Sequence, residues 1–295
     1  MSAPAVAGRQ RTGSPLAGRL AWLTLAGGLA VQSAFALMPD DIGLTVASVV
    51  LFALTAMLHA AGVAGWWRGA AMLAGIAALG LVAEALGVAT GFPFGEYAYT
   101  GGLGPQVLGV SALVLLAWAT LAYPAWVVAR TLVRPTWAVV LVGAWALTAW
   151  DVFLDTQMVD AGNWGWAHPQ PALPLTPDIP LTNYAGWFGV SVLMMLLIEA
   201  VVGRAARPRA LTGPRALTGP AGSARATSAP EPLRTYAVPY VVYVWTWLTS
   251  IAGNLSFWDR PNVALAGGLA MGVIAVPLLV LVLREPRRRR RIGAP

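Results

Sequence analysis

Acidic residues that fall inside apolar segments are the first candidates for chemistry. Glu84 lies within the apolar run 69–90, and the string Trp150-Asp-Val-Phe-Leu-Asp155 places Asp151 and Asp155 four residues apart at the end of another run. Residues spaced by four share one face of a helix, so these two carboxyl groups lie side by side if the helix continues. An ionisable group inside a membrane segment is costly and is therefore a functional candidate. The alternative explanation is a contact with a neighbouring helix for Glu84, and solvation at the helix end for the aspartate pair.

Such carboxyl groups suit acid–base chemistry on an apolar substrate. Burial disfavours the charged form of a carboxyl group, so a buried acid can keep its proton at neutral pH and give it to an alkene. Glu96, in the aromatic loop 91–104, is a further carboxylate expected at the same side of the membrane. The candidate catalytic residues are therefore Glu84, Glu96, Asp151 and Asp155.

Aromatic rings could stabilise the tertiary cation that alkene protonation creates, because cations bind to ring faces. Trp150 and Trp187 adjoin the polar segments, and a stripe of rings follows in the run 235–254. The spacing of four, three and four in this stripe places its rings on one helix face that leads toward Asn254. Helix packing is the alternative explanation for the stripe. The candidate substrate-binding residues are Trp150, Trp187, Tyr236, Tyr240, Tyr243, Trp247 and Asn254.

The elements that must position these side chains are membrane helices. The chain is 58% hydrophobic and 11% charged, whereas a soluble domain carries about 25% charged residues. Because a soluble fold cannot hide so much apolar surface, the chain is expected to fold in the bilayer as an all-α polytopic membrane helical bundle of about eight transmembrane helices. The expected spans are 20–37, 42–62, 69–90, 105–123, 135–151, 184–202, 235–254 and 262–283.

Arginine placement predicts the orientation of this bundle. All 19 basic residues are arginine, and all except Arg260 fall on one side of the eight spans. The positive-inside rule makes that side cytoplasmic, so both termini are expected there, in a multi-pass protein of the cell (plasma) membrane. A signal peptide ending at Ala34-Phe-Ala36 is the alternative for the first run. The expected segments are an N-terminal tail, six spans, a low-complexity linker, two spans and an Arg-rich tail, at 1–19, 20–203, 204–234, 235–283 and 284–295.

The residue types that the chain lacks exclude several reaction classes. It has no Cys, no Lys and only two histidines, His59 and His168. Thiol nucleophiles, iron–sulfur clusters, Schiff-base lysines and multi-His iron centres are thereby excluded. The net charge of +7 reports topology and anionic lipid in a membrane protein, and no nucleic-acid-binding module accompanies it. We therefore expect acid–base chemistry with no organic cofactor and no metal site.

Three strings resemble motifs of a known family. They are Gly91-Phe-Pro-Phe-Gly-Glu-Tyr-Ala-Tyr99, Trp150-Asp-Val-Phe-Leu-Asp-Thr-Gln-Met158 and Ile179-Pro-Leu-Thr-Asn-Tyr-Ala-Gly-Trp187. They are similar to the membrane carotenoid-biosynthesis proteins that include the bacterial γ-carotene 1′,2′-hydratase and the archaeal bisanhydrobacterioruberin hydratase, over roughly the third to the eighth span. Thr156 stands where this family usually has Pro. The resemblance implies cofactor-free addition of water to the terminal double bond of an acyclic carotenoid, and it implicates Glu84, Glu96, Asp151, Asp155 and Asn183.

The resulting hypothesis is a carotenoid 1,2-hydratase, a hydro-lyase without a cofactor. Glu84 or Asp151 would protonate the terminal alkene of a lycopene-like, γ-carotene-like or C50 precursor, and Asp155 or Glu96 would guide water to the cation. Three alternatives stay open: a lycopene-type cyclase, a prenyltransferase that holds magnesium diphosphate with Asp151 and Asp155, and a non-catalytic carotenoid-binding partner. The expected partners are the carotenoid, the lipid bilayer and, as a further candidate, other membrane enzymes of the carotenoid pathway.

Overall fold

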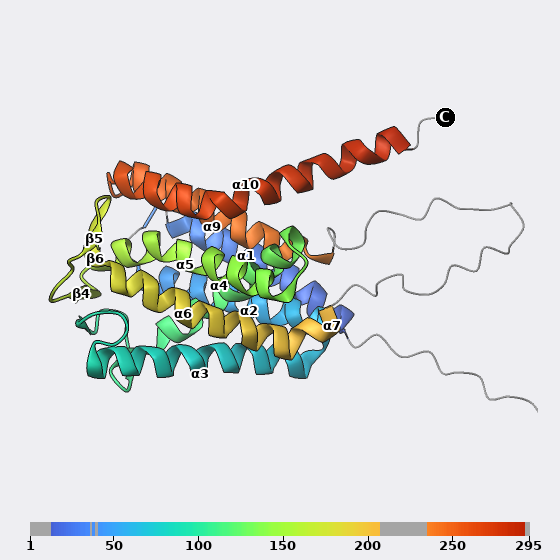
Figure 1. The fold of residues 1–295 in the computed structure, drawn as a ribbon. Coiled ribbons are helices and arrows are strands. Elements are labelled where there is room, and N and C mark those ends of the chain that lie inside the picture. Colours follow the sequence, from blue (N-terminus) through green and yellow to red (C-terminus); the bar gives the residue numbers. More distant parts are fainter. Residues whose placement is uncertain (1–12, 36, 39–40, 207–234, 293–295) are drawn as a thin grey trace, which may run out of the picture.

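Long α-helices make up the fold in this computed structural model, which describes residues 13–35, 37–38, 41–206 and 235–292 (Figure 1). A π-helical turn, η1 (Glu199–Gly203), and the short α7 (Arg204–Ala206) continue α6. The predicted all-α bundle is confirmed. The long helices are α1 (Pro15–Phe35), α2 (Ile42–Ala64), α3 (Trp66–Thr90), α4 (Ala112–Leu132), α5 (Thr136–Asp160), α6 (Leu181–Ile198), α9 (Ala237–Ser256) and α10 (Pro261–Ile292).

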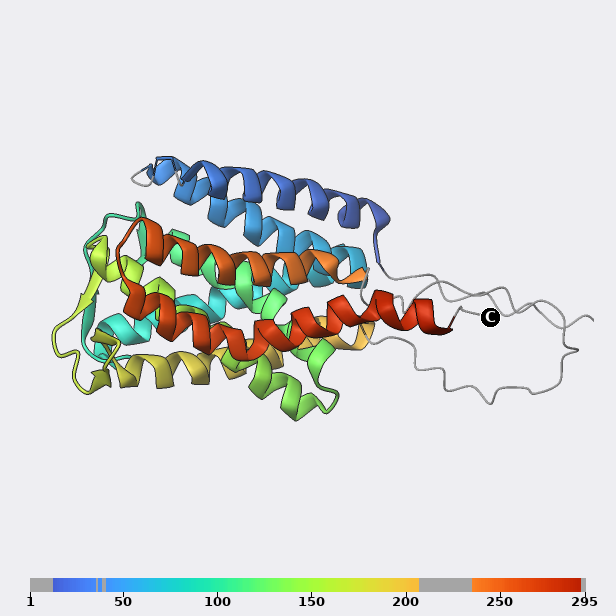
Figure 2. The ribbon, with the colours of Figure 1, turned by 90° about the horizontal axis from the view of Figure 1, so that it is seen from above.

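Six helices of the described chain are long and apolar enough to cross a membrane: α2, α3, α4, α5, α6 with η1, and α10. The 23 residues of α2 correspond to a length of about 35 Å, more than the roughly 30 Å of the hydrocarbon core. Helices α1 and α9, with 21 and 20 residues, run alongside them (Figure 2). The protein is therefore a multi-pass membrane protein.

The two ends of the bundle differ in charge. Helix α1 begins and α10 ends at the same end (Figure 1), as an even number of crossings requires. We call this the basic end and the opposite one the loop end. Most of the predicted tail 1–19 and linker 204–234 lies outside the described residues, and α10 continues through the predicted Arg-rich tail as far as Ile292. The arginines that lie at the basic end, on helices or in the α4–α5 loop, are Arg19, Arg68, Arg130, Arg134, Arg204 and Arg284.

Several predicted helix boundaries were wrong, and two of them lie near the polar residues of interest. Helix α4 begins at Ala112 rather than at 105, because Ser111 caps it: the Ser111 hydroxyl accepts a hydrogen bond from the Leu113 amide at 3.3 Å. Helix α5 continues to Asp160 rather than ending at 151. Its last turns are polar in sequence but buried in the bundle, so the loss of apolar character did not mark the helix end. Asp151 and Asp155 consequently lie inside a continuous helix.

Short antiparallel strand pairs fold over the loop end. Strand β1 (Tyr97–Tyr99) pairs with β4 (Trp164–Trp166), and thereby joins the α3–α4 loop to the α5–α6 loop. The other pairs join neighbouring segments: β2 (Gln106–Val107) with β3 (Val110–Ser111), and β5 (Ala172–Leu173) with β6 (Thr176–Pro180). No strand was predicted from the sequence. The β1–β4 pair matters most, because it brings two distant aromatic segments over the same helices.

Candidate active site

Glu84 lies on α3 near the loop end and is only 4% exposed. Its Oε2 atom accepts hydrogen bonds from the hydroxyls of Tyr97, at 2.6 Å, and Tyr99, at 2.9 Å. Both rings project from the same face of β1, because alternate residues of a strand point the same way. One carboxyl oxygen is therefore held by two donors from a single strand.

Phe94 fixes the loop that carries these tyrosines. It is buried between α3 and α6, and stacks on Trp187 with 4.6 Å between ring centroids. Two glycines permit this close approach: a Cβ at Gly87 would lie 2.6 Å from the Phe94 ring, and a Cβ at Gly186 would lie 2.8 Å from it. Any larger residue at either position would push the loop, and with it Tyr97, away from Glu84.

Asp155 supplies a second carboxyl group from α5. The side-chain amide of Asn183, in the first turn of α6, donates a hydrogen bond of 2.5 Å to Asp155 Oδ2. Both side chains are buried. This contact joins two residues that were predicted for the site, and it fixes one oxygen of the carboxyl group.

Glu84 and Asp155 line one small cavity with a volume of about 20 Å³, which is room for about one water molecule. Its walls are largely aromatic, and the indoles of Trp118 and Trp187 stack with 3.8 Å between centroids. Trp150, a predicted substrate-binding residue, meets Trp118 edge-on but does not line this cavity. We call it the carboxylate cavity. Its lining residues are Glu84, Tyr97, Tyr99, Val114, Trp118, Leu154, Asp155, Trp164, Trp166, Asn183 and Trp187.

The β1–β4 pair places four aromatic rings on this cavity. Tyr97 is paired with Trp166 and Tyr99 with Trp164, and the ring centroids of the two pairs are 5.8 and 5.5 Å apart. The sequence analysis did not assign these four residues to the site, nor Trp118. The signal was present in the strings Tyr-Ala-Tyr and Trp-Gly-Trp, whose alternation is typical of strands with one aromatic face.

Asp151 behaves differently from Asp155. It is fully buried, and neither of its carboxyl oxygens has a hydrogen-bond partner among the described residues. It lies one helical turn from Asp155, as predicted, but it does not line the carboxylate cavity. The two aspartates therefore do not open onto the same space.

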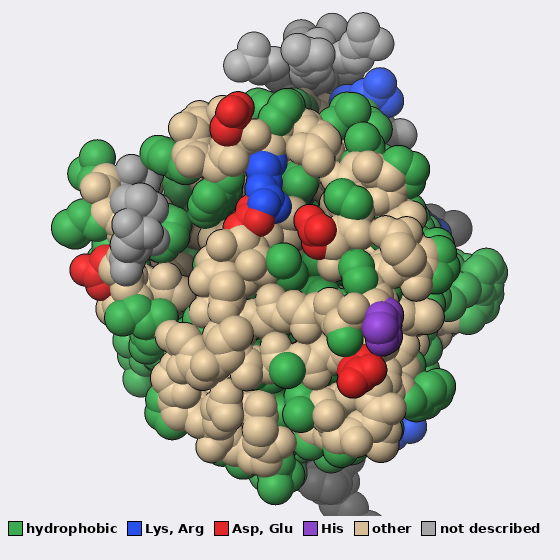
Figure 3. Space-filling model, turned by 90° about the vertical axis from the view of Figure 1, so that its left-hand side faces the viewer, with side chains coloured by type: hydrophobic (Ala, Val, Ile, Leu, Met, Phe, Trp, Pro, Cys, Tyr) green, Lys and Arg blue, Asp and Glu red, His purple; other side chains and the backbone are tan. Residues whose placement is uncertain are grey.

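Glu96 is the predicted catalytic residue that lies farthest from this arrangement. Its side chain is exposed on the loop, and it does not line the carboxylate cavity. Only its backbone takes part in the loop structure, since its carbonyl accepts a hydrogen bond from the amide of Ala167 at 2.9 Å. Exposed acidic side chains are scattered over the loop end rather than gathered in one patch (Figure 3).

Two further acidic residues are held by arginines away from the cavity. At the basic end, Glu199 forms an ion pair with Arg130 at 3.0 Å. At the loop end, Asp160 pairs with Arg260, the arginine that the sequence placed on this side. These ion pairs explain why both carboxylates are present, without any catalytic role.

The structure does not bring the aromatic stripe of α9 to the site. The Tyr240 hydroxyl lies 2.7 Å from a threonine hydroxyl of α4, Tyr243 donates to a carbonyl of α5, and Trp247 donates to a carbonyl of α10. Tyr236 lies against the ring of a histidine of α2, and the Asn254 amide donates to a carbonyl of its own helix. The stripe therefore packs α9 against its neighbours, which was the alternative explanation.

Comparison with known proteins identifies the family. The family described as carotenoid biosynthesis protein matches residues 44–219, which span α2 to α7 and include every residue of the carboxylate cavity. The last two helices, to which the resemblance was expected to extend, lie outside the match. No curated protein and no solved structure matches the chain. Because the match covers more than half of the sequence, the chain belongs to the carotenoid biosynthesis protein family.

Proposed function

We propose that the protein is a carotenoid hydratase of the plasma membrane, which adds water across the terminal double bond of an acyclic carotenoid end. The observation that carries the proposal is the meeting of two buried carboxyl groups in one aromatic cavity with room for about one water molecule. Carotenoids are apolar, so a site enclosed in a membrane bundle can receive them without crossing water.

Asp155 is the proposed proton donor. Asn183 donates a hydrogen bond to Oδ2 of its carboxyl group, and this group lines the cavity in which the alkene is protonated. The proton adds to the CH carbon of the terminal double bond, and the positive charge forms on the neighbouring tertiary carbon. This assignment differs from the sequence hypothesis, in which Glu84 or Asp151 was the donor, because Asp151 does not line the cavity.

The aromatic walls are proposed to stabilise the tertiary cation. Six aromatic rings line the cavity, those of Tyr97, Tyr99, Trp118, Trp164, Trp166 and Trp187. A ring face attracts a cation by about 0.5–2 kcal/mol, and more where water is excluded. The β1–β4 pair covers the cavity at the loop end, which limits the water that could quench the cation at random.

Glu84 is proposed to activate the attacking water. Two hydroxyl donors on one oxygen favour a carboxylate, because hydrogen bonds to a charged acceptor are stronger than those to a neutral one. Glu84 takes a proton from water as the water oxygen bonds to the tertiary carbon. Asp155 has lost one proton and Glu84 has gained one, so a single transfer across the shared cavity restores both groups.

The product formed in a lycopene-producing cell that receives this gene alone tests the proposal. The expected result is a carotenoid heavier by one water per reacted end, with a tertiary alcohol and an unchanged polyene chromophore, measured by mass spectrometry and absorbance. A cyclised product of unchanged mass would assign the same acid to a cyclase instead. Absence of any new carotenoid, with the protein present in the membrane, would contradict catalysis and leave a binding role.

The prenyltransferase alternative has less structural support. It requires Asp151 and Asp155 to hold one metal–diphosphate group together, and metal-bound diphosphate needs an open polar site. Asp151 is buried without access to the cavity that Asp155 lines. The aromatic walls of that cavity also suit a cation better than a diphosphate.

The tyrosine hydroxyls give a further prediction. Burial and the neighbouring Glu84 carboxylate raise the pKa of both Tyr97 and Tyr99 above the ordinary value of a phenol. Both hydroxyls therefore remain protonated, and tyrosine ionisation should cause no loss of activity between about pH 8 and pH 10. Tyr97→Phe is expected to slow hydration about 10- to 100-fold, because a hydrogen bond to a charged group contributes about 1.5–3 kcal/mol.

The matched control for this change is Tyr184→Phe. The Tyr184 hydroxyl donates to Thr176 at 3.1 Å and does not line the carboxylate cavity. Conversion of added lycopene by purified protein, followed over pH, provides the rate. Equal rates for Tyr97→Phe and Tyr184→Phe would show that the hydroxyl on Glu84 has no part in the reaction.

A further inference from the structure

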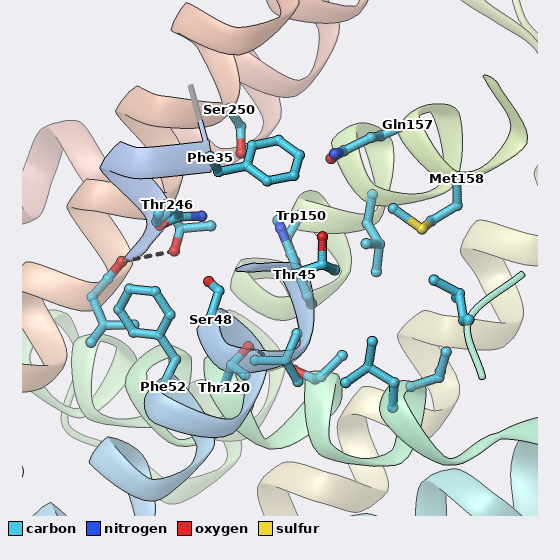
Figure 4. Close-up of a pocket in the computed structure, with 18 of the residues that line it drawn as sticks. Phe35, Thr45, Ser48, Phe52, Thr120, Trp150, Gln157, Met158, Thr246 and Ser250 are labelled. Carbon is cyan, nitrogen blue, oxygen red and sulfur yellow. Dashed lines mark hydrogen bonds between the residues drawn. The ribbon is translucent and has the colours of Figure 1, made fainter. Parts of the chain in front are cut away.

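A second, larger cavity adjoins the carboxylate cavity. It has a volume of about 180 Å³ and lies between the α1–α2 hairpin and helices α4, α5 and α9 (Figure 4). Val114, Leu154 and Trp164 line both cavities, so the two spaces adjoin each other. We call it the large cavity. Its other lining residues are Gln32, Phe35, Thr45, Ser48, Val49, Phe52, Leu103, Leu113, Ala117, Thr120, Trp150, Gln157, Met158, Val242, Thr246 and Ser250.

The size of the large cavity suits a short stretch of hydrocarbon. An engineered apolar cavity of about 150 Å³ takes up benzene, so the roughly 180 Å³ here can hold one or two five-carbon units. The carboxylate cavity is far smaller, with room for about one water molecule. A chain whose end reacts beside Asp155 must continue somewhere, and the large cavity is the adjoining space.

The lining of the large cavity is more apolar than its residue names suggest. None of the residues that line it is charged, and Phe35, Phe52 and Trp150 supply aromatic walls. Three of its polar groups are already engaged: the hydroxyls of two threonines, on α4 and α9, donate to carbonyls of their own helices at 2.7 and 2.9 Å, and Gln32 accepts from the Trp245 indole at 2.6 Å. Because these three groups already form hydrogen bonds within the protein, they can form fewer hydrogen bonds to water.

We propose that the large cavity binds the isoprenoid chain directly behind the reacting end. This inference rests on the proposed function, because it takes the reacting end to lie between Glu84 and Asp155. Side chains from α1 and α9 form part of its wall, and both helices lie outside the family match. The walls that hold the chain would then lie partly outside the family-matched region that contains the acids.

Binding can be measured separately from reaction. Wild-type protein and Asp155→Asn are purified from lycopene-producing cells, and the bound carotenoid per protein is determined by extraction and absorbance. Two substitutions fill the large cavity, Ser48→Trp on α2 and Thr246→Trp on α9. The matched controls are Val46→Trp and Leu248→Trp, whose side chains are 40% and 50% exposed on the same helices.

The cavity-filling variants are expected to lose at least about tenfold in bound carotenoid in both backgrounds, while the controls keep it. This loss corresponds to about 1.4 kcal/mol of binding. Ala117→Leu fills part of the same space from α4 and should give an intermediate loss, which keeps the test valid if a tryptophan variant fails to accumulate. Bound carotenoid equal to that of wild type in all filled variants would overturn the inference.

Variants of equal volume distinguish an apolar occupant from water. Ser48→Ala and Thr246→Val remove hydroxyls without filling space, so binding of an apolar chain should stay within about twofold of wild type. A strong loss in these variants would assign the cavity to water or a polar ligand instead, and would also overturn the inference. Cavity-dependent binding without any hydrated product would contradict the proposed reaction alone.

Discussion

Replacing Asp155 with asparagine is expected to abolish hydration, with a loss of about 1000-fold in rate or more. Asparagine keeps the size of the side chain but cannot give a proton to an alkene, and positioned general acids contribute about 100- to 10,000-fold. The measurement is the ratio of hydrated to unreacted carotenoid formed from lycopene by purified protein. Protein recovered per membrane fraction shows whether the variant still folds.

Asp178→Asn is the control for this change, because Asp178 is an exposed carboxylate on β6. It should hydrate at the wild-type rate. Asp151→Asn answers a different question, since Asp151 is the other buried aspartate of α5. If Asp155→Asn remained active and Asp151→Asn did not, the donor role would pass to Asp151 and the proposed mechanism would be wrong.

Glu84→Gln is expected to slow hydration about 100- to 1000-fold while leaving protonation of the alkene intact. Glutamine has the size of glutamate but cannot accept the proton of the attacking water, and loss of a general base has an effect of this order. The cation still forms, and it returns to the alkene when Asp155 takes a proton back. In heavy water this variant should incorporate deuterium at the terminal CH carbon without forming alcohol.

The deuterium experiment separates the two acids. Asp155→Asn should show neither exchange nor hydration, whereas Glu84→Gln should show exchange alone. Glu96→Gln, which changes an exposed carboxylate of the α3–α4 loop, should hydrate normally. Exchange lost in Glu84→Gln but kept in Asp155→Asn would mean that the roles of the two groups are reversed.

The bundle itself was predictable, because hydropathy depends on composition over a long window and tolerates local errors. The ends of the helices were harder to predict from the sequence. The polar residues at 151–160 suggested that the chain leaves the membrane there. In the structure the side chains of residues 151, 152, 155 and 156 are buried, and three of these four are polar. Which helices will bury such groups is information that no single segment contains.

The site was predicted in part. Glu84, Asp155, Asn183 and Trp187 do line one cavity, because each lies near the loop end of a helix and the α5–α6 contact joins two of them. Period alone could not decide which face of α9 lines a cavity. The aromatic stripe packs against neighbouring helices, and the smaller side chains of Val242, Thr246 and Ser250 line the large cavity instead.

The aromatic cover of the site depends on pairing over a long sequence distance. Tyr97 meets Trp166 and Tyr99 meets Trp164 only when two loops separated by α4 and α5 come together. A hydrophobic pattern reports how a segment meets its surroundings, and it carries no information about which other segment will pair with it. The alternation within each string was visible in the sequence, but the sequence did not show that these two strings pair with each other.

The β1–β4 pair also has a consequence for exchanging parts between family members. A chimera that takes residues 91–104 from a relative, but keeps its own residues 161–180, would set one member's tyrosine rings against another's tryptophans. Grafting both loops together preserves the register Tyr97 to Trp166 and Tyr99 to Trp164. The two loops should therefore be inherited, and engineered, as one unit.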